Sequence, residues 1–532
     1  MSRKLLKSTA VTGSMTLVSR ITGLIRDIAF AHVIGASAGI VADAFYVAFR
    51  IPNFFRRIFG EGAFSQAFVP VYTEYHARAS DQERRAFLDQ LTGLFAATLT
   101  LVTIIGVIAA PLVVSILAPG FRASPEKYQL TVQILRITFP YLAFVSLVAM
   151  AAGILNSHDR FAVPAFTPVI LNLCLIAAAL WLAPALGNSG VALAWGVFVA
   201  GVLQLLFQIP FLRRIRALPR PRLARGHAGV KRVGKLMLPA VFGSSVAQVN
   251  LLVNTLLASF LVNGSVAWLY YSDRLMEFPL GVFGIALATV TLPSLSRAHV
   301  NKTTDEFSQL LDWAMRWVVL VSVPAAVGLI ALAEPMLVTL FMYGKFGVHD
   351  VSMSGRALIA FALGLPAFIL VKILASGFYA RQNTQTPARI AALSVGANIV
   401  LSLALIYPLA HMGLALAISL AAFVNAALLF HLLRREDAYT PLPGWGALLL
   451  RVAVASTVMG LAMTWGAGEL SLWTDAGVPA RILRLGILVA VGVVVYIAGI
   501  LLLGVRPREL VLRRVQVGTN GRATSHSTDR PL

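Results

Sequence analysis

The sequence is poor in charged residues and has a single cysteine. Only 12% of its 532 residues are charged and 58% are hydrophobic, whereas soluble domains carry about 25% charged residues. Cys174 lies in an apolar run and offers neither a disulfide nor a metal site. Nucleotide-binding P-loops, HExxH motifs and acid clusters able to hold Mg²⁺ are also missing. The composition therefore predicts a polytopic membrane protein without metal or cofactor.

Acidic residues are half as frequent as basic ones. The chain has 44 Lys and Arg against 22 Asp and Glu, a net charge of +22. In a soluble protein such an excess suggests nucleic-acid binding. In a membrane protein it marks cytoplasmic loops, so we expect no nucleic-acid partner. Arg20 and Arg26 interrupt the first apolar stretch, so we also expect no cleaved signal peptide.

Apolar stretches long enough to cross a bilayer recur along the whole chain. A transmembrane helix needs about 20 such residues. The sequence predicts fourteen helices, at residues 11–35, 42–71, 90–118, 129–155, 163–182, 190–212, 236–261, 266–295, 310–333, 352–379, 390–407, 412–433, 446–467 and 485–505. Loops on the side of the N-terminus hold 28 Lys and Arg, and those on the opposite side hold 5. The positive-inside rule therefore places both termini in the cytoplasm.

A short motif repeats in the second and eighth predicted helices. The second helix contains Tyr46-x-x-x-Arg50, then Ile-Phe-Gly, then Val-Pro. The eighth contains the corresponding Tyr270-x-x-x-Arg274, Val-Phe-Gly and Leu-Pro, each 223 or 224 residues later. Six helices separate the copies, which preserves orientation and favours a parallel repeat, although chance similarity between apolar helices is the alternative. The predicted fold class is an all-α membrane protein with two six-helix lobes around a central cationic cavity, plus two C-terminal helices. The predicted units are an N-terminal lobe (1–212), a basic cytoplasmic linker (213–235), a C-terminal lobe (236–434), helices thirteen and fourteen (446–505), and a disordered cytoplasmic tail (506–532).

Ionisable residues inside the predicted spans are the main functional signal. The second span alone carries Asp43, Arg50, Arg56, Arg57 and Glu61. A charge at the bilayer centre costs roughly 2.5–3.5 kcal/mol on insertion scales, so these groups must face a polar cavity. A helix rise of about 1.5 Å per residue brings them near mid-membrane together with charges on the first and eighth spans. Those further charges are Arg20, Arg26, Asp27, Asp273, Arg274 and Glu277.

The surplus of arginine indicates an anionic cargo. Arg presents a planar fork suited to phosphate, so we expect Arg20, Arg26, Arg56 and Arg274 to bind a diphosphate, with Arg50 as a supplementary charge. Asp27, Asp43, Arg57, Glu61, Asp273 and Glu277 would support them. The structural alternative is that adjacent acids and bases, such as Arg57 and Glu61, only neutralise each other.

Several sequence motifs resemble one known family. The run DAFYVAFRIPNFFRRIFGEGAFSQAFVP, the preceding SRITGLIRD and the later YYSDRLMEFPLGVFGIALATVTLPSLS resemble the MurJ (MviN) family. These are bacterial lipid II flippases of the multidrug/oligosaccharidyl-lipid/polysaccharide exporter superfamily. The resemblance implies a fourteen-helix transporter, not an enzyme, that functions in peptidoglycan and cell-wall biogenesis. It also implies that helices thirteen and fourteen form a groove for the lipid tail.

The implied substrate is lipid II, the undecaprenyl-diphosphate-linked disaccharide-pentapeptide. The resemblance implies that it moves from the inner to the outer leaflet of the bacterial cytoplasmic membrane by alternating access, driven by the membrane potential. Cavity arginines of the family match Arg20, Arg26, Arg56 and Arg274 here. Implied partners are lipid II, membrane lipids and proteins of cell-wall synthesis or division. The alternatives are an exporter of another polyprenyl-linked glycan, a cation-coupled drug exporter, a polyprenyl-phosphate transferase and an assembly scaffold.

Overall fold

Apolar helices dominate the computed structural model, which describes residues 3–57, 64–224, 226–301 and 303–505, with backbone only at 3–12, 238–240, 242–247, 285 and 304. Within these ranges ten helices are long and apolar enough to cross a membrane, with mean hydropathies of 1.8 to 2.8 over their most apolar windows. No strand occurs in the same ranges. Helices suit such sequences because each one satisfies its own backbone hydrogen bonds in lipid. The chain is therefore a multi-pass helical membrane protein.

The first part of the chain contains ten helices among the described residues. They are α1 (Arg3–Ile34), α2 (Val41–Phe55), α3 (Phe64–Arg78), α4 (Asp81–Ile108), α5 (Ala110–Leu117), α6 (Pro125–Thr138), α7 (Tyr141–Ser157), α8 (Ala162–Ala177), α9 (Ala183–Leu186) and α10 (Ser189–Arg214). A 3₁₀ turn, η2 (Pro119–Ala123), and a π-helical turn, η3 (Ala178–Leu182), lie between them. Polar caps fix where two of the helices begin: Ser80 and Glu83 form a capping box on α4, and Asn188 accepts from the Val191 amide on α10.

The second part contains the remaining helices of the described chain. They are α11 (Ala228–Ala258), α12 (Ser265–Pro279), α13 (Ile285–Val300), α14 (Thr304–Ala331), α15 (Ala333–Phe341), α16 (Val348–Ala380), α17 (Gln385–Arg435), α18 (Trp445–Ala467), α19 (Ser471–Thr474) and α20 (Val478–Leu502). A π-helical turn, η4 (Leu280–Gly284), joins α12 to α13. The last eight residues of the predicted linker, 228–235, are the first turns of α11.

The element α17 is two helices joined by a sharp turn. Ala410 has a φ of 48° and a ψ of −129°, which breaks the helix two residues after Pro408. The Ser394 hydroxyl donates to the Ala421 carbonyl, and Gly413 lies against the Leu405 carbonyl. The pair 405 and 413 lies between 394 and 421 in the sequence, so the contacts close progressively toward the turn. The two halves therefore run antiparallel. The break falls between the two spans predicted at 390–407 and 412–433.

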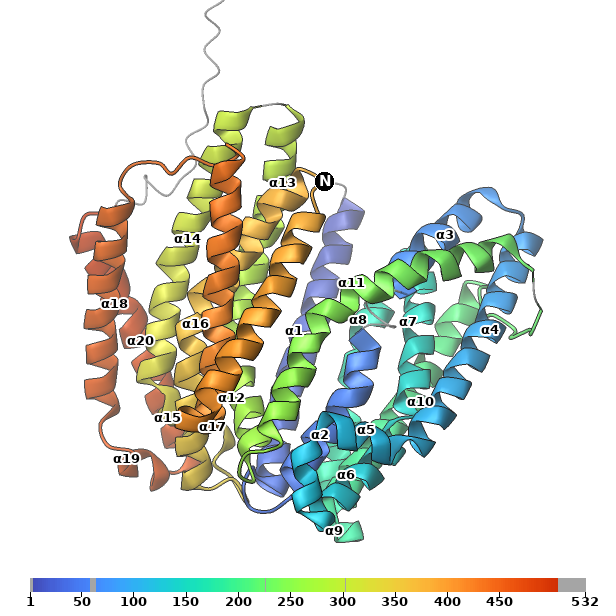
Figure 1. Ribbon diagram of the computed structural model, residues 1–532, viewed down its shortest axis with the longest axis horizontal. Helices are drawn as coiled ribbons and strands as arrows, with labels where there is room; N and C mark the ends of the chain where they lie inside the picture. Colours follow the sequence, from blue (N-terminus) through green and yellow to red (C-terminus); the bar gives the residue numbers. More distant parts are fainter. Residues whose placement is uncertain (1–2, 58–63, 225, 302, 506–532) are drawn as a thin grey trace, which may run out of the picture.

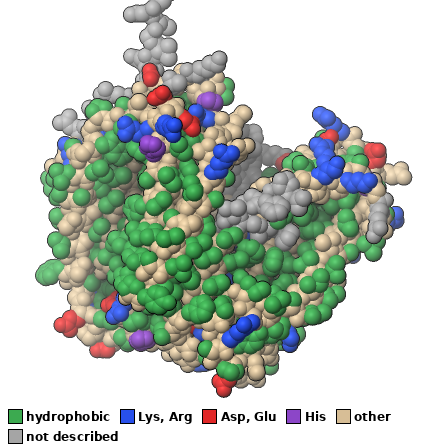
Figure 2. Space-filling model, in the orientation of Figure 1, with side chains coloured by type: hydrophobic (Ala, Val, Ile, Leu, Met, Phe, Trp, Pro, Cys, Tyr) green, Lys and Arg blue, Asp and Glu red, His purple; other side chains and the backbone are tan. Residues whose placement is uncertain are grey.

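The helices form two groups that meet at one end of the molecule and diverge at the other. The diverging end is the one where the N-terminus lies (Figure 1). Helix α11 crosses from one group to the other, since its first half lies over α3 and α4 and its second half lies beside α17. Figure 2 shows a hollow between the groups at the diverging end, and apolar side chains covering the middle of the visible face.

Asp312 of α14 fixes the C-terminal helices to the rest of the chain. Its carboxylate is fully buried and accepts from the Tyr439 hydroxyl at 2.7 Å, the Trp445 indole at 2.8 Å and Arg316 Nε at 2.6 Å. Trp445 begins α18, so this carboxylate holds the start of the helix against α14. Burial, together with the bond to Asp312, raises the pKa of Tyr439 well above its ordinary value, so the hydroxyl keeps its proton.

We expect Asp312→Asn to destabilise the protein by on the order of 3 kcal/mol, because it removes the charge of a buried ion pair. The Asn side chain has only one acceptor oxygen, so it cannot accept from every donor that bonds to the two carboxylate oxygens of Asp312. The measurement is the thermal unfolding midpoint of the purified protein in detergent. Asp305→Asn, at an exposed position in the first turn of the same helix, is the control. Equal midpoints for the two variants would contradict this role.

Candidate functional site

The helices α1 and α12 bring two arginines to one buried carboxylate. Asp27 is fully buried, and its Oδ1 accepts from Arg26 Nη2 at 2.6 Å while its Oδ2 accepts from Arg274 Nε at 2.7 Å. The Tyr270 hydroxyl donates to the same carboxylate at 2.9 Å, and Asn172 Oδ1 accepts from Arg26 Nη1 at 3.0 Å. The side chain of Arg274 remains 32% exposed. One guanidinium is thus enclosed and the other is accessible.

Two glycines allow the guanidinium groups to approach the backbone closely. A Cβ at Gly23 of α1 would lie 2.7 Å from Arg274 Nη2, and a Cβ at Gly281 of η4 would lie 2.6 Å from Arg20 Nη1. Each arginine therefore lies against a glycine of the other helix group, where any larger residue would collide with it. The second glycine lies in a π-helical turn, a local form that is frequent at functional sites.

The arginines in and just after α2 have different partners. Arg50 Nη1 donates to the Thr255 hydroxyl of α11 at 2.7 Å, and Arg56 Nε donates to Asn53 Oδ1 at 2.9 Å. Arg57 is exposed at the end of the described part of this segment. Glu61 lies outside the described residues, so its predicted pairing with Arg57 stays a prediction.

Two further predicted acids lie on α12, near a base that the predicted set omitted. Glu277 is 48% exposed and contacts Arg274 at 3.5 Å. Asp273 lies within electrostatic range of Arg50. Lys372 of α16 lies within electrostatic range of Glu277 and Arg20. The signal for Lys372 was present in the sequence, since it and Arg356 are two basic residues inside one mostly apolar predicted span.

Together the described members of this group carry more positive than negative charge. The bases are Arg20, Arg26, Arg50, Arg56, Arg57, Arg274 and Lys372, and the acids are Asp27, Asp273 and Glu277. Across the described residues no cluster of three or more His, Cys, Asp or Glu side chains could hold a metal ion. An arrangement of this kind suits a polyanion that can exchange places with a protein carboxylate.

Asp43 bonds at the opposite, closed end of the molecule instead of pairing with an arginine among the described residues. Its carboxylate is 1% exposed and accepts from Lys127 Nζ at 2.7 Å. It also accepts from the backbone amides of Gly264 at 2.9 Å and Ala267 at 3.1 Å, which begin α12. The N-terminus of a helix carries a partial positive charge that favours a carboxylate. An acid of the first helix group thus caps a helix of the second.

Asp350 makes the reciprocal connection. This buried acid of α16 accepts from the Ser37 hydroxyl at 2.5 Å and the Ser37 amide at 3.1 Å, both just before α2. Trp268 of α12 donates its indole hydrogen to the same oxygen at 2.9 Å. The Lys345 amide adds a bond to the His32 carbonyl. We call Asp43 and Asp350, with these partners, the carboxylate latches; they join the helix groups where the groups meet.

We expect Asp27→Asn to strengthen the binding of inorganic pyrophosphate by about tenfold, or about 1.4 kcal/mol. The substitution removes the carboxylate that now competes for Arg26 and Arg274. The measurement is calorimetric titration of the purified protein in lipid nanodiscs. Asp475→Asn, at an exposed loop position, is the control. Unchanged or weaker binding would show that the carboxylate does not compete with an anion.

Comparison with known proteins gives one consistent result. The family model described as "Lipid II flippase MurJ" matches residues 30–484. A Vibrio cholerae protein named "Probable lipid II flippase MurJ" is 45% identical over 518 residues, covering 96% of this chain and 98% of that protein. "Lipid II flippase MurJ" of Burkholderia cenocepacia is 44% identical and covers 87% of this chain and 90% of that protein.

Solved structures agree with the family match. A structure titled "Lipid II flippase MurJ, inward closed conformation" has a TM-score of 0.77 and 27% identity, and the match covers 92% of this chain and 98% of that one. An inward-facing multidrug transporter of the MATE family has a TM-score of 0.66 at 14% identity. That second likeness concerns the fold alone.

Proposed function

The chain belongs to the MurJ family, and on that basis we propose that it is a lipid II flippase, a transporter and not an enzyme. Its cargo would be the undecaprenyl-diphosphate-linked peptidoglycan precursor, moved from the inner to the outer leaflet of the cytoplasmic membrane. The observation that carries the proposal beyond family membership is the meeting of Arg26 and Arg274 at Asp27, from two helix groups.

The site addresses the main energetic obstacle to flipping. Moving a charged diphosphate through hydrocarbon would remove its water, at an idealised cost of tens of kcal/mol. Guanidinium donors on α1, α2 and α12 would replace that water, while the polyprenyl tail stays in lipid. Arg274 is partly exposed and Arg20 is exposed, so both leave donors accessible to an entering headgroup.

Release requires that the diphosphate is not held too strongly. Asp27 already binds both Arg26 and Arg274, so an arriving diphosphate would displace a carboxylate and a departing one would be replaced by it. The net free energy of binding is then the difference between the arginine–diphosphate and the arginine–Asp27 interactions, which are similar in kind. Such an exchange keeps the arginines compensated in both states, as charges within a membrane must be.

The topology that we propose has fourteen crossings in two lobes, with both termini in the cytoplasm. The positive charge of the loops supports this orientation. The hollow between the helix groups would then open to the cytoplasm, and the carboxylate latches would close the outer side. The membrane potential supplies about 2.3 kcal/mol per charge per 100 mV, enough to draw an empty, positively charged site back toward the cytoplasm.

We expect Arg26→Ala and Arg274→Ala each to reduce flipping at least tenfold, since a loss of about 1.4 kcal/mol in binding has that effect. Arg274→Lys keeps the charge but loses the fork, so it should fall between the alanine variant and the native protein. The measurement is the arrival of lipid II at the outer leaflet in cells that depend on this protein. Arg389→Ala, an exposed arginine of α17, is the control. Full flipping by both alanine variants at normal abundance would refute the assignment.

If the carboxylate latches close the outer side, a covalent cross-link between the two partners of one latch should stop transport. In a Cys174→Ser background, Ser37→Cys with Asp350→Cys should react with a short thiol-cleavable bifunctional reagent, since the native side chains lie 2.5 Å apart. Cross-linking should abolish flipping, and a reductant should restore it. Ser37→Cys alone, treated with the same reagent, should flip normally. Continued transport by the fully cross-linked protein would mean that this end need not open.

A further inference from the structure

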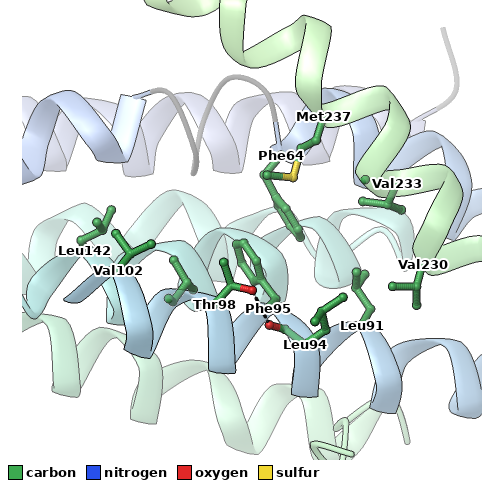
Figure 3. Close-up of a pocket in the computed structure, with 12 residues that line it drawn as sticks. Phe64, Leu91, Leu94, Phe95, Thr98, Val102, Leu142, Val230, Val233 and Met237 are labelled. Atoms are coloured by element: carbon green, nitrogen blue, oxygen red, sulfur yellow. Dashed lines mark hydrogen bonds between the residues drawn. The ribbon is translucent and has the colours of Figure 1, made fainter. Parts of the chain in front are cut away.

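An apolar cavity of about 230 Å³ lies in the first helix group, apart from the charged site. It is bounded by α3, α4, α7 and α11, and Figure 3 shows Phe64, Phe95, Val233 and Met237 around it. Cavities lined by apolar side chains do not hold water, and an empty one destabilises a fold in proportion to its volume.

The lining offers nothing to a polar ligand. The hydroxyl of Thr98 is the single side-chain hydroxyl among the lining residues, all of which are described, and it donates to the Leu94 carbonyl of its own helix at 2.8 Å. That bond is the dashed line in Figure 3. Every other lining side chain is aliphatic, aromatic or a thioether, apart from Gly234. The occupant must therefore be a hydrocarbon.

The cavity is continuous with the surface of α4 that faces lipid. Leu94, Leu101, Ile105 and Ile108 follow one another at intervals of seven, four and three residues, and are between 48% and 72% exposed. This spacing places them on one stripe of a helix, and α4 is one of the apolar membrane-length helices. Leu94 belongs both to this stripe and to the cavity lining. Hydrocarbon that covers the stripe therefore also reaches the cavity.

Gly234 leaves the space open on the side of α11. A Cβ built at this glycine meets no atom within 4 Å, although the residue lines the cavity. Glycine inside a helix is about 1 kcal/mol less favourable than alanine, and here neither a turn nor a close contact requires it. The missing side chain keeps room at this part of the lining, on the half of α11 that lies over α3 and α4.

We propose that this cavity binds one acyl chain of a bilayer phospholipid, which enters between α4 and α11. The chain packs between the first half of α11 and the helices α3 and α4, and so holds that half on the first helix group. A bilayer phospholipid is the occupant because the lipid-facing stripe leads into the cavity, whereas the diphosphate arginines lie on α1, α2 and α12. This inference does not depend on the transported substrate.

The test uses the full-length protein in nanodiscs of phosphatidylethanolamine and phosphatidylglycerol, with a trace of phosphatidylethanolamine carrying a diazirine on one acyl chain. After illumination, mass spectrometry should find label on the lining residues of α3, α4 and α11. Gly234→Leu should reduce that label at least about fivefold, because leucine fills the space, while label on the lipid-facing side of α20 stays unchanged. Gly396→Leu, also a helical glycine with open space around it, should label like the native protein.

Two outcomes would overturn the proposal. Equal labelling of the lining residues in Gly234→Leu and the native protein would mean that no chain occupies the cavity. Loss of the label when undecaprenyl phosphate is added would identify a polyprenyl chain as the occupant. Thr98→Trp, which blocks the mouth from the side of α4, is the second variant should Gly234→Leu fail to fold, and it must lower the label in the same way.

Discussion

Charge compensation at Asp27 is the interaction on which the rest of this structure depends. A guanidinium within a membrane is tolerated when it faces a polar partner, and one carboxylate serves as that partner for Arg26 and Arg274. Since these arginines come from different helix groups, the same bonds hold the groups together near the centre. The site is therefore part of the scaffold, and a ligand that takes one arginine also loosens a contact between the groups.

The carboxylate latches follow the same logic at the closed end. Asp43 and Asp350 each belong to one helix group and accept hydrogen bonds from the other. The donors from the opposite group are the backbone amides of Gly264, Ala267 and Ser37 and the short Ser37 hydroxyl, so these bonds join backbone to carboxylate across the groups. The diverging end has a hollow between the groups. The proposed alternating access would require such a difference, because one side must be sealed while the other is open.

The helical membrane architecture could be predicted from apolar length, since ten helices among the described residues are long and apolar enough to cross a membrane. The count of fourteen crossings stays a prediction. Counting residues along α1, α2 and α12 also predicts a depth for each arginine. Depth does not give a partner, however. That Asp27 is shared, and that Asp43 bonds Lys127 and α12, depends on how helices far apart in sequence rotate toward each other. Lys127 lies between two predicted spans, yet it is buried.

Tyr46 and Tyr270 occupy equivalent positions of the repeated motif, and their rings stack with centroids 4.1 Å apart. The two rings belong to different helix groups, and the Tyr270 hydroxyl also donates to Asp27 at 2.9 Å. The ring pair is therefore a contact between the groups beside the charged site. If the groups tilt against each other while this contact is kept, opening one end of the molecule closes the other.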